Sequence, residues 1–324
     1  MELWFNASAD FTKWIIAEGL LQEPFVVVDI GVQGDASVRW DLLDDYLIFH
    51  GFDAISEEID KLNRLNNHRP NRNFHNIAMG EADKEQLFYF NPTNPTVSSM
   101  YEHGASRFEG TLSGEARVVT VRRLDTLFAS GVIPRADFLK VDVEGHEREV
   151  FLGAREFIGA SVLAIETETS FGISPNYPKS HFVAMTELLV QQHMLVFDLN
   201  FNRVPRASYQ RMLSRLDRQI TSELGVGKPA TMNVLFCRDL IDETDHQENY
   251  LTPCPPVSID QMVKMMIIYE LHGLNDIALD TAERFAEDLG TRLDVDQAIR
   301  LLANPDCGPS TPLIERIRYL EKLQ

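Results

Sequence analysis

One segment of the sequence places three ionisable side chains within five residues. Asp142 ends the expected strand that begins at Asp137, and Glu144 and His146 follow it. Gly145 permits a tight turn among them. A histidine of near-neutral pKa, or a carboxylate whose pKa is raised by burial, can accept a proton from an alcohol. His146 is therefore our first candidate for a general base. Asp142 is expected to orient or contact a ligand, and Glu144 is the alternative base.

Two other roles for this segment stay open at the level of sequence. His146 could instead begin a helix and bond a neighbouring carboxylate, because sequence alone carries no geometry. Asp142, Glu144, Glu166 and Glu168 could together hold Mg²⁺, which prefers oxygen ligands. Strand-end carboxylates also occur as cofactor contacts or as solvated residues. We favour that last interpretation, which predicts no metal-binding residues.

A second constellation closes the apolar run that begins at Phe25. It reads Asp29-Ile-Gly31-Val32-Gln-Gly34. Glycines at a strand-to-helix turn let the backbone approach a ligand, and a helix amino terminus favours negative groups. The same glycines would also suit a tight turn that binds nothing.

Asp53 ends the next apolar run, where an acidic side chain can accept hydrogen bonds from both ribose hydroxyls of an adenosine-containing ligand. An exposed strand-end aspartate without a ligand is the alternative. The pairing of Asp29 and Asp53 does not separate S-adenosylmethionine from NAD. The first turn nevertheless lacks the Gly-x-Gly-x-x-Gly spacing that an NAD-dependent oxidoreductase would need.

The elements that must position these residues alternate between β-branched runs and helical patterns, which predicts βαβ units and a largely parallel sheet. The expected strands are 25–29, 46–52, 73–79, 85–90, an edge strand at 118–121, 137–142, 162–166, 195–204 and 231–238. The expected helices are 37–45, one carrying Ile55, Ile59, Leu62 and Leu65, then 124–130, 147–158, 182–192, 259–271, 275–289, 294–302 and 311–323. A mostly helical insert separates the last two strands, and a proline-rich connector occupies 252–256.

Residues 91–116 hold several glycines and prolines without a regular apolar repeat, which predicts a long loop. Loops of this length in compact domains are often functional. Ser98, Ser99, Met100 and Tyr101 could contact a substrate there. A surface excursion without a role is the alternative.

Composition restricts the class of protein. The 324 residues are 44% hydrophobic and 24% charged, as in ordinary folded proteins rather than disordered or membrane proteins. The net charge of −19 argues against nucleic acid as a partner, because that requires clustered lysine and arginine. We expect no membrane span, no signal peptide and a cytoplasmic location. Cys237, Cys254 and Cys307 are widely separated and are expected to be reduced.

The segment Lys140-Val-Asp-Val-Glu-Gly-His-Glu147, followed by Gly153-Ala154, resembles the FkbM-type methyltransferase family. The resemblance extends over about 25–168. Its further landmarks stand in the family's order: Asp29-Ile-Gly31, Gly51-Phe-Asp53, Asn76-Ile-Ala-Met-Gly80, Ser98-Ser99, Leu124-Asp125 and Ala164-Ile-Glu166.

The resemblance implies a Rossmann-like class I methyltransferase fold, with a mostly parallel seven-stranded sheet and a late antiparallel strand. It also implies that S-adenosylmethionine lies over the first and second strand ends. The expected cofactor contacts are Asp29, Gly31, Val32, Gly34, Asp53, Ala54, Ala78 and Asp142. Methyl transfer in the family commonly goes to an oxygen of a sugar, a polyketide or a related small molecule.

The first turn departs from the family pattern. Asp35 stands where the family usually has its second glycine, Gln33 replaces the usual asparagine, and Ala54 stands where proline is common. A carboxylate at position 35 would repel the methionine carboxylate of the cofactor unless it turns outward. A non-catalytic binding or assembly protein on a methyltransferase-like fold is therefore the main rival to an O-methyltransferase.

The chain divides on sequence into an amino-terminal helical segment, 1–24, a catalytic domain, 25–240, and a small helical appendix, 241–324. The appendix helices have apolar faces that must pack on something. The catalytic domain, a second copy of the chain and another protein are all candidates. The expected substrate partner is a small-molecule or glycan acceptor.

Overall fold

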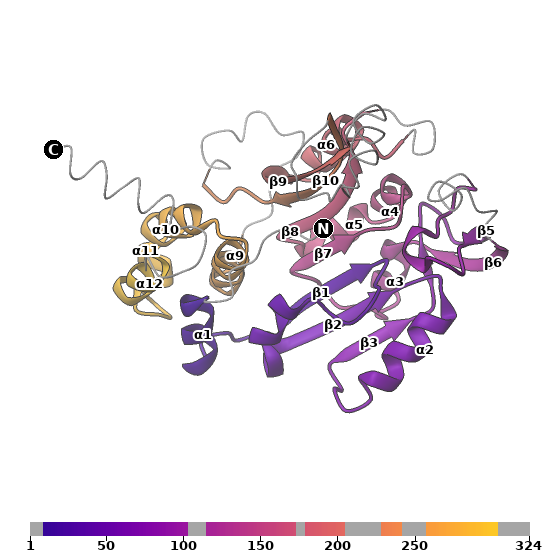
Figure 1. Ribbon diagram of the computed structural model, residues 1–324. Coiled ribbons are helices and arrows are strands. Elements are labelled where there is room, and N and C mark those ends of the chain that lie inside the picture. The colour runs from indigo at the N-terminus through magenta and orange to yellow at the C-terminus, as the bar shows by residue number, and fades with distance from the viewer. Residues whose placement is uncertain (1–8, 103–114, 173–178, 205–227, 242–256, 304–324) are drawn as a thin grey trace, which may run out of the picture.

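A computed structural model describes residues 9–102, 115–172, 179–204, 228–241 and 257–303 (Figure 1). Its centre is a seven-stranded sheet in the order β3-β2-β1-β7-β8-β10-β9. The strands are β1 (Phe25–Ile30), β2 (Leu47–Phe52), β3 (Arg72–His75), β7 (Phe138–Val141), β8 (Ala164–Ser170), β9 (Leu195–Val204) and β10 (Lys228–Cys237).

The sheet confirms the fold class expected from the sequence. β10 runs antiparallel to both its neighbours, β8 and β9, whereas the pairs among β3, β2, β1, β7 and β8 are all parallel. All six residues of β1 are buried, as expected for a central strand covered on both faces. The chain thus has the expected Rossmann-like α/β architecture, with a mostly parallel seven-stranded sheet and a helical carboxyl-terminal appendix.

A second sheet of three strands, in the order β4-β6-β5, lies beside the carboxyl ends of β1 and β2 (Figure 1). These strands are β4 (Ala78–Met79), β5 (Lys84–Phe90) and β6 (Glu115–Arg122). Two predictions were wrong here. The expected strand 73–79 is split between the sheets, because the chain turns at residues 76–77. The expected edge strand 118–121 is the middle strand, since β4 and β5 both pair with it.

Helices cover both faces of the large sheet. They are α1 (Asp10–Ala17), α2 (Ser56–Leu65), α3 (Leu124–Ala129), α4 (Glu147–Leu152), α5 (Arg155–Ser161), α6 (Phe182–Val190), α9 (Ile259–Leu271), α10 (Asn275–Arg284), α11 (Ala286–Leu289) and α12 (Val295–Leu302). One face packs with α3 to α6, and the other packs with α1, α2 and α9 to α12. None of the helices that the structure describes has both the length and the apolar character that a bilayer crossing requires.

Three predicted helices take a different form. The segment expected as helix 37–45 forms two 3₁₀ turns, η1 (Val38–Leu42) and η2 (Asp44–Tyr46). The amides of Trp40, Leu43 and Tyr46 each bond the carbonyl three residues earlier. This spacing puts Trp40 and Leu43 on one buried face, which a 3₁₀ repeat of three residues per turn permits.

The other two predicted helices are each broken in two. The helix expected at 147–158 stops at Gly153, where a Cβ would lie 2.0 Å from the carbonyl oxygen of Gly80. The glycine therefore lets the end of α4 touch the turn after β4. The helix expected at 275–289 is interrupted at Phe285, between α10 and α11. The expected insert between β9 and β10, the proline-rich connector and the helix at 311–323 lie outside the described residues.

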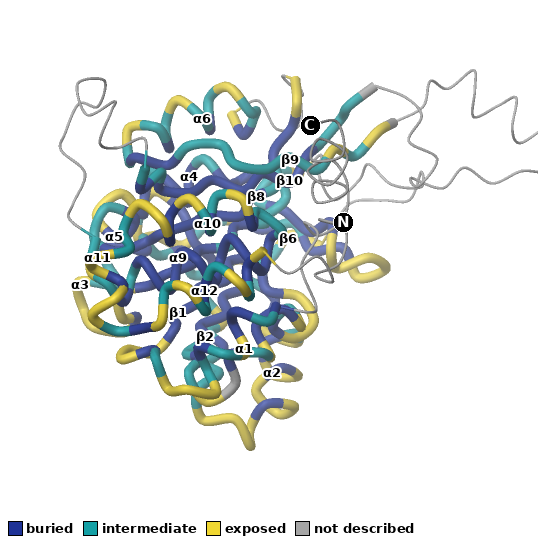
Figure 2. The backbone as a smooth tube through the Cα atoms, turned by 90° about the vertical axis from the view of Figure 1, so that its left-hand side faces the viewer, coloured by how far each residue is buried: buried dark blue, intermediate teal, exposed yellow. Residues whose placement is uncertain are grey.

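The appendix shares one core with the sheet. α9 is apolar on nearly all sides and largely buried, while α10 and α12 carry exposed residues (Figure 2). The carboxylate of Glu270 accepts hydrogen bonds from the amides of Phe11 and Thr12 and from the Thr12 hydroxyl, at 2.7–2.8 Å. A buried acid of α9 thus binds the amino end of α1, where orphan amides need acceptors.

Candidate active site

The turns after β1 and β7 touch at the carboxyl edge of the sheet. Gly31 has φ of +86°, and a Cβ there would lie 1.9 Å from the carbonyl oxygen of Asp142. Only glycine accepts both that backbone angle and that contact without strain. The two segments that the sequence analysis singled out, the turn at Gly31 and the turn at Asp142, are therefore in contact.

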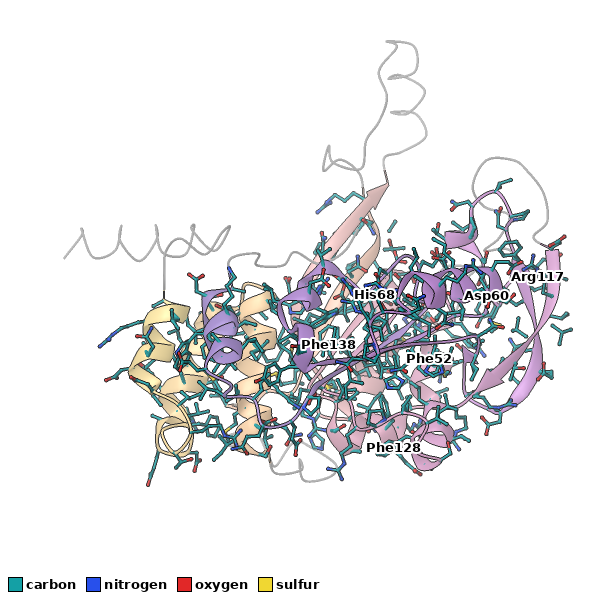
Figure 3. The ribbon with its side chains drawn as sticks, turned by 90° about the horizontal axis from the view of Figure 1, so that it is seen from below. Phe52, Asp60, His68, Arg117, Phe128 and Phe138 are labelled. Atoms are coloured by element: carbon teal, nitrogen blue, oxygen red, sulfur yellow. The ribbon has the colours of Figure 1, made fainter. Side chains whose placement is uncertain are left out.

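A cleft opens at this edge and encloses about 500 Å³ of empty space, part of it open to solvent. Its lining comes from the ends of β1, β2, β4 and β7 and from the small sheet: Ile30, Gly31, Gln33, Phe52, Asp53, Ala54, Ile55, Ile77, Ala78, Met79, Phe88, Thr96, Ser98, Met100, Asp142, Val143, Glu144 and His146. Phe52 lies among the interior side chains in Figure 3, and Arg117 marks the outer part of the small sheet.

Asp53 is held rigidly at one end of the cleft. One of its carboxylate oxygens accepts the amide hydrogen of Ile55 at 2.6 Å, and its carbonyl accepts a bond from the Asn76 side chain at 3.1 Å. Burial raises the pKa of Asp53 to about 7, although the Ile55 amide counteracts this. Ala54 and Ala78 line the cleft beside it.

The altered first turn directs its extra charge outward. Asp35 accepts bonds from the Ala36 amide at 2.7 Å and from Arg72 at 3.0 Å. Its carboxylate is therefore engaged away from the cleft. Gly34 adopts φ of +75°, and its amide donates to the carboxylate of Glu58 at 3.0 Å.

Three of the expected cofactor contacts are absent from the lining of the cleft. Val32 is buried in the hydrophobic core, the Gly34 amide bonds Glu58, and Asp29 is buried with Lys140 3.5 Å from its carboxylate. Gly31, Asp53, Ala54, Ala78 and Asp142 do line it, as do the proposed catalytic residues Glu144 and His146. The structure thus brings most of the predicted site residues to one cleft.

The turn 142–146 is clamped from three sides. Glu147 is buried and accepts the amide hydrogens of Val143 at 3.2 Å and Gly145 at 2.9 Å. The hydroxyl of Ser99 donates to the carbonyl of Glu144 at 2.8 Å, and that of Ser180 donates to the carbonyl of Gly145 at 2.7 Å. These bonds hold Glu144 at a φ of +53°, which is rare for a residue with a side chain.

Sequence reasoning missed this clamp. It named Ser99 only as a possible substrate contact and gave no role to Glu147 or Ser180. An acidic side chain in the first helical turn after a glycine is the signal that could have revealed Glu147, because such residues commonly bond free amides at a helix start. No local pattern pointed to Ser180, which comes from a distant segment.

Three carboxylates converge beside the turn. One carboxylate oxygen from each of Asp142, Glu144 and Glu168 lies within 4.8 Å of the other two. Burial raises the pKa of Glu144 to about 9, and the neighbouring charges of Glu168 and Asp142 add to the effect. The pKa of Glu168 is also raised, chiefly by burial.

Glu166 belongs to a different environment, although the sequence grouped it with these acids. Arg39 lies 2.7 Å from its carboxylate, and both side chains are almost fully buried. Burial alone would raise its pKa, but Arg39 and His272 lower it to about 2. Only three of the four acids considered for Mg²⁺ therefore come together.

His146 is buried at the cleft, immediately before α4. Burial lowers its pKa, so the imidazole is neutral near pH 7. Its Nδ1 lies 3.8 Å from a carboxylate oxygen of Glu149, and its ring meets that of Tyr101 edge-on, with centroids 5.9 Å apart. His146 thus has the protonation state that a base requires.

The model of the methyltransferase FkbM domain family matches residues 39–203 of this sequence. The chain belongs to this family. The matched part includes Asp53 and the whole segment from Asp137 to Glu147, and it begins after the altered turn at Gly31–Asp35. The comparison with curated proteins found no match.

Solved structures similar to this FkbM-domain chain include two methyltransferases and a fibrillarin. The FkbM methyltransferase from Methylobacillus flagellatus KT has 13% identity and a TM-score of 0.36, over 69% of this chain and 47% of that one. Fibrillarin from Aeropyrum pernix, with natively bound S-adenosyl-L-methionine, has 10% identity and a TM-score of 0.33, over 71% of this chain and 73% of that one. Magnesium protoporphyrin IX methyltransferase from Synechocystis PCC 6803, with bound SAM, has 8% identity and a TM-score of 0.33, over 70% and 76%. The match spans less than half of the M. flagellatus protein.

Proposed function

We propose that this chain is an S-adenosylmethionine-dependent methyltransferase that methylates a hydroxyl oxygen of a small molecule or sugar. The observation that carries the proposal is the cleft at the carboxyl edge of β1, β2 and β7, with the buried acidic residue Asp53 in its lining. In open parallel sheets, ligands bind outside that edge.

The side chains of the cleft fit S-adenosylmethionine. One carboxylate oxygen of Asp53 accepts the Ile55 amide, which leaves the other for ribose hydroxyls. The apolar side chains of Ile77, Ala78 and Val143 suit an adenine ring. Asp142, beyond the Gly31 contact, offers a carboxylate to the methionine ammonium group. Contacts from the backbone of Val32 and Gly34 stay predictions.

S-adenosylmethionine supplies an electrophilic methyl group, so the chain's own task is to position the acceptor oxygen and take its proton. His146 is the proposed proton acceptor, because its imidazole is neutral near pH 7. Glu144 is the alternative. With a pKa of about 9, its carboxyl group is already protonated at neutral pH and cannot accept another proton.

The proposal is tested by methyl transfer from labelled S-adenosylmethionine to a panel of sugars and other hydroxylated small molecules. Removal of a general base typically costs about 10²- to 10⁴-fold in rate. His146→Ala should lose turnover to that extent and keep its affinity for S-adenosylmethionine. Unchanged turnover in His146→Ala would remove the base assignment, and transfer to no hydroxylated acceptor would contradict the proposed activity.

A further inference from the structure

Glu149 on α4 is a buried carboxylate beside His146, and its side chain is 4% exposed. Burying a carboxylate is costly unless cations and hydrogen-bond donors surround it. The polar side chains that approach it within the described part of the chain include those of Lys179, Tyr101 and His146. The Nδ1 atom of His146 is also buried and has no hydrogen-bond partner of good geometry among the described residues.

These two groups face each other. His146 Nδ1 and Glu149 Oε2 are 3.8 Å apart, one turn along the start of α4. That separation is an ion-pair distance, too long for a hydrogen bond. Catalytic hydrogen bonds are often long until a substrate fills the site and then tighten.

Other charged groups act on the same pair. Lys179 Nζ lies 3.1 Å from the other carboxylate oxygen of Glu149. Burial lowers the pKa of His146 most, Glu149 and Glu81 raise it, and Lys84 and Lys179 lower it. Burial, the charges of Glu149 and Glu147 and a hydrogen bond with Glu149 raise the pKa of the Tyr101 phenol. The carboxylate thus meets a lysine on one side and the imidazole on the other.

The second ring nitrogen of His146 points toward the turn after β4. A Cβ on Gly80 would lie 3.2 Å from Nε2, so glycine leaves room for that edge of the ring. Met79 and Ala78, just before it, line the cleft. With Nδ1 directed at Glu149, Nε2 lies beside Gly80, which directly follows two residues of the cleft lining.

We propose that Glu149 is a positioning residue that holds the proton of neutral His146 on Nδ1 and leaves the Nε2 lone pair to take the acceptor's proton. This rests on the proposed function. As the acceptor oxygen bonds the methyl carbon, the carbon–sulfur bond breaks and its electron pair stays on sulfur. The hydroxyl proton passes to Nε2, and the resulting imidazolium lies beside the Glu149 carboxylate, which stabilises it.

Nitrogen NMR of histidine-labelled protein tests the proposal without requiring turnover. The signals of His146 are assigned by their loss in His146→Gln. In the wild type we expect the Nδ1–H form, and in Glu149→Gln a shift toward the Nε2–H form with the titration midpoint at lower pH. Glu156→Gln, an exposed glutamate on α5, is the matched control and should change neither.

Kinetics give the second readout. Glu149→Gln should lower kcat by about 10- to 100-fold with little change in KM, and Glu149→Asp should recover part of that loss. The proposal is overturned if the tautomer and the titration midpoint of His146 are unchanged in a folded Glu149→Gln protein. If Glu149→Gln does not fold, the same comparison is made with Glu149→Asp, which keeps the charge and lengthens the contact. A wild type that transfers no methyl group would contradict the proposed function, whereas the NMR result still decides whether Glu149 pairs with His146.

Discussion

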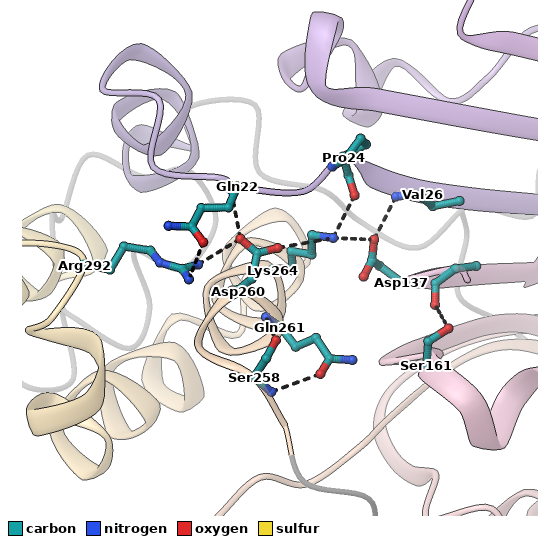
Figure 4. Close-up of polar contacts among 11 residues, drawn as sticks. Gln22, Pro24, Val26, Asp137, Ser161, Ser258, Asp260, Gln261, Lys264 and Arg292 are labelled. Atoms are coloured by element: carbon teal, nitrogen blue, oxygen red, sulfur yellow. Dashed lines mark hydrogen bonds and ion pairs between the residues drawn. The ribbon is translucent and has the colours of Figure 1, made fainter. Parts of the chain in front are cut away.

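The two ends of strand β7 carry aspartates in opposite circumstances. At the amino end, Asp137 accepts the Val26 amide at 2.8 Å and pairs with Lys264 of α9 at 3.0 Å. Lys264 also donates to the carbonyl of Pro24 and lies 3.4 Å from Asp260 (Figure 4). At the carboxyl end, Asp142 stands with two glutamates, and Lys140 approaches it only to 3.7 Å.

The comparison separates the amino edge of the sheet, which stabilises the fold, from the carboxyl edge, at which we propose that the cofactor binds. Charges at the amino edge are matched, bonded and buried, and they join the appendix to the sheet. At the carboxyl edge, burial and the closeness of the carboxyl groups raise the pKa values of Glu144 and Glu168, and perturbed pKa values of this kind are typical of functional sites. Substitutions at the two ends should therefore have opposite effects on stability.

The largest effect is expected at the amino edge. Lys264→Met leaves Asp137 buried without Lys264 and leaves Asp260 to Arg292, and breaking a buried pair on one side costs about 3–5 kcal/mol. Urea unfolding followed by circular dichroism measures the change. Lys13→Met, which removes an exposed lysine 3.9 Å from Asp10, is the control and should cost less than about 1 kcal/mol. Equal losses of unfolding free energy in the two variants would refute the claim that the buried ion pairs of Lys264 stabilise the fold.

The next effect concerns the contact between the two turns. Gly31→Ala places a methyl group against the Asp142 carbonyl, and overpacking of this kind costs about 1–3 kcal/mol. We expect the affinity for S-adenosylmethionine to fall about 10- to 100-fold, measured by calorimetric titration. Gly34 also has a positive φ but open space around its Cβ position, so Gly34→Ala separates backbone strain from collision. An affinity that falls equally in both variants would mean that the collision is irrelevant.

The pH dependence of cofactor binding follows from Asp53. Its pKa of about 7 means that the carboxylate is mostly protonated at pH 6 and mostly ionised at pH 8. If only the ionised form binds ribose, the affinity should rise about tenfold between these values. Asp53→Asn should bind more weakly and lose this dependence. A wild-type affinity that stays constant from pH 6 to pH 8 would count against Asp53 as the ribose contact.

The smallest effect is a gain of stability at the carboxyl edge. The folded pKa of Glu144, about 9, lies above its unfolded value, so the folded state loses stability as pH rises from about 4.5 to 9. Glu144→Gln removes this loss and should stabilise the protein by about 1–2 kcal/mol at pH 8, with little difference at pH 4. Unfolding in urea at both pH values checks the sign. Destabilisation of Glu144→Gln at pH 8 would show that favourable contacts of Glu144 outweigh the cost of ionising it in the folded protein.

Sequence reasoning succeeded where the signal is local and repeated. The order of strands and helices followed from apolar periodicity, and α9 and β9 have the predicted bounds. It failed where contacts between residues far apart in the sequence determine where an element ends or which strands it pairs with. The break at Gly153 depends on the carbonyl of Gly80, and the central place of β6 depends on strands paired from both sides.

The candidate site divides in the same way. Asp53, Asp142, Glu144 and His146 line one cleft, and they could be named in advance because strand ends and residue types are visible in the sequence. The outward turn of Asp35 was not visible, because it depends on Arg72 from another strand. The sequence also could not separate Glu166 from Glu168, since only the fold places Arg39 against the former.

Calorimetric titration of S-adenosylmethionine into three proteins tests most directly whether binding belongs to the carboxyl edge alone. The proteins are the wild type, Asp142→Asn, and Lys264→Met at a temperature where circular dichroism finds it folded. We predict that the wild type and Lys264→Met bind with similar affinity and that Asp142→Asn binds at least about tenfold more weakly. Absence of binding to the wild type at millimolar ligand, or equal affinity of the wild type and Asp142→Asn, would contradict the account.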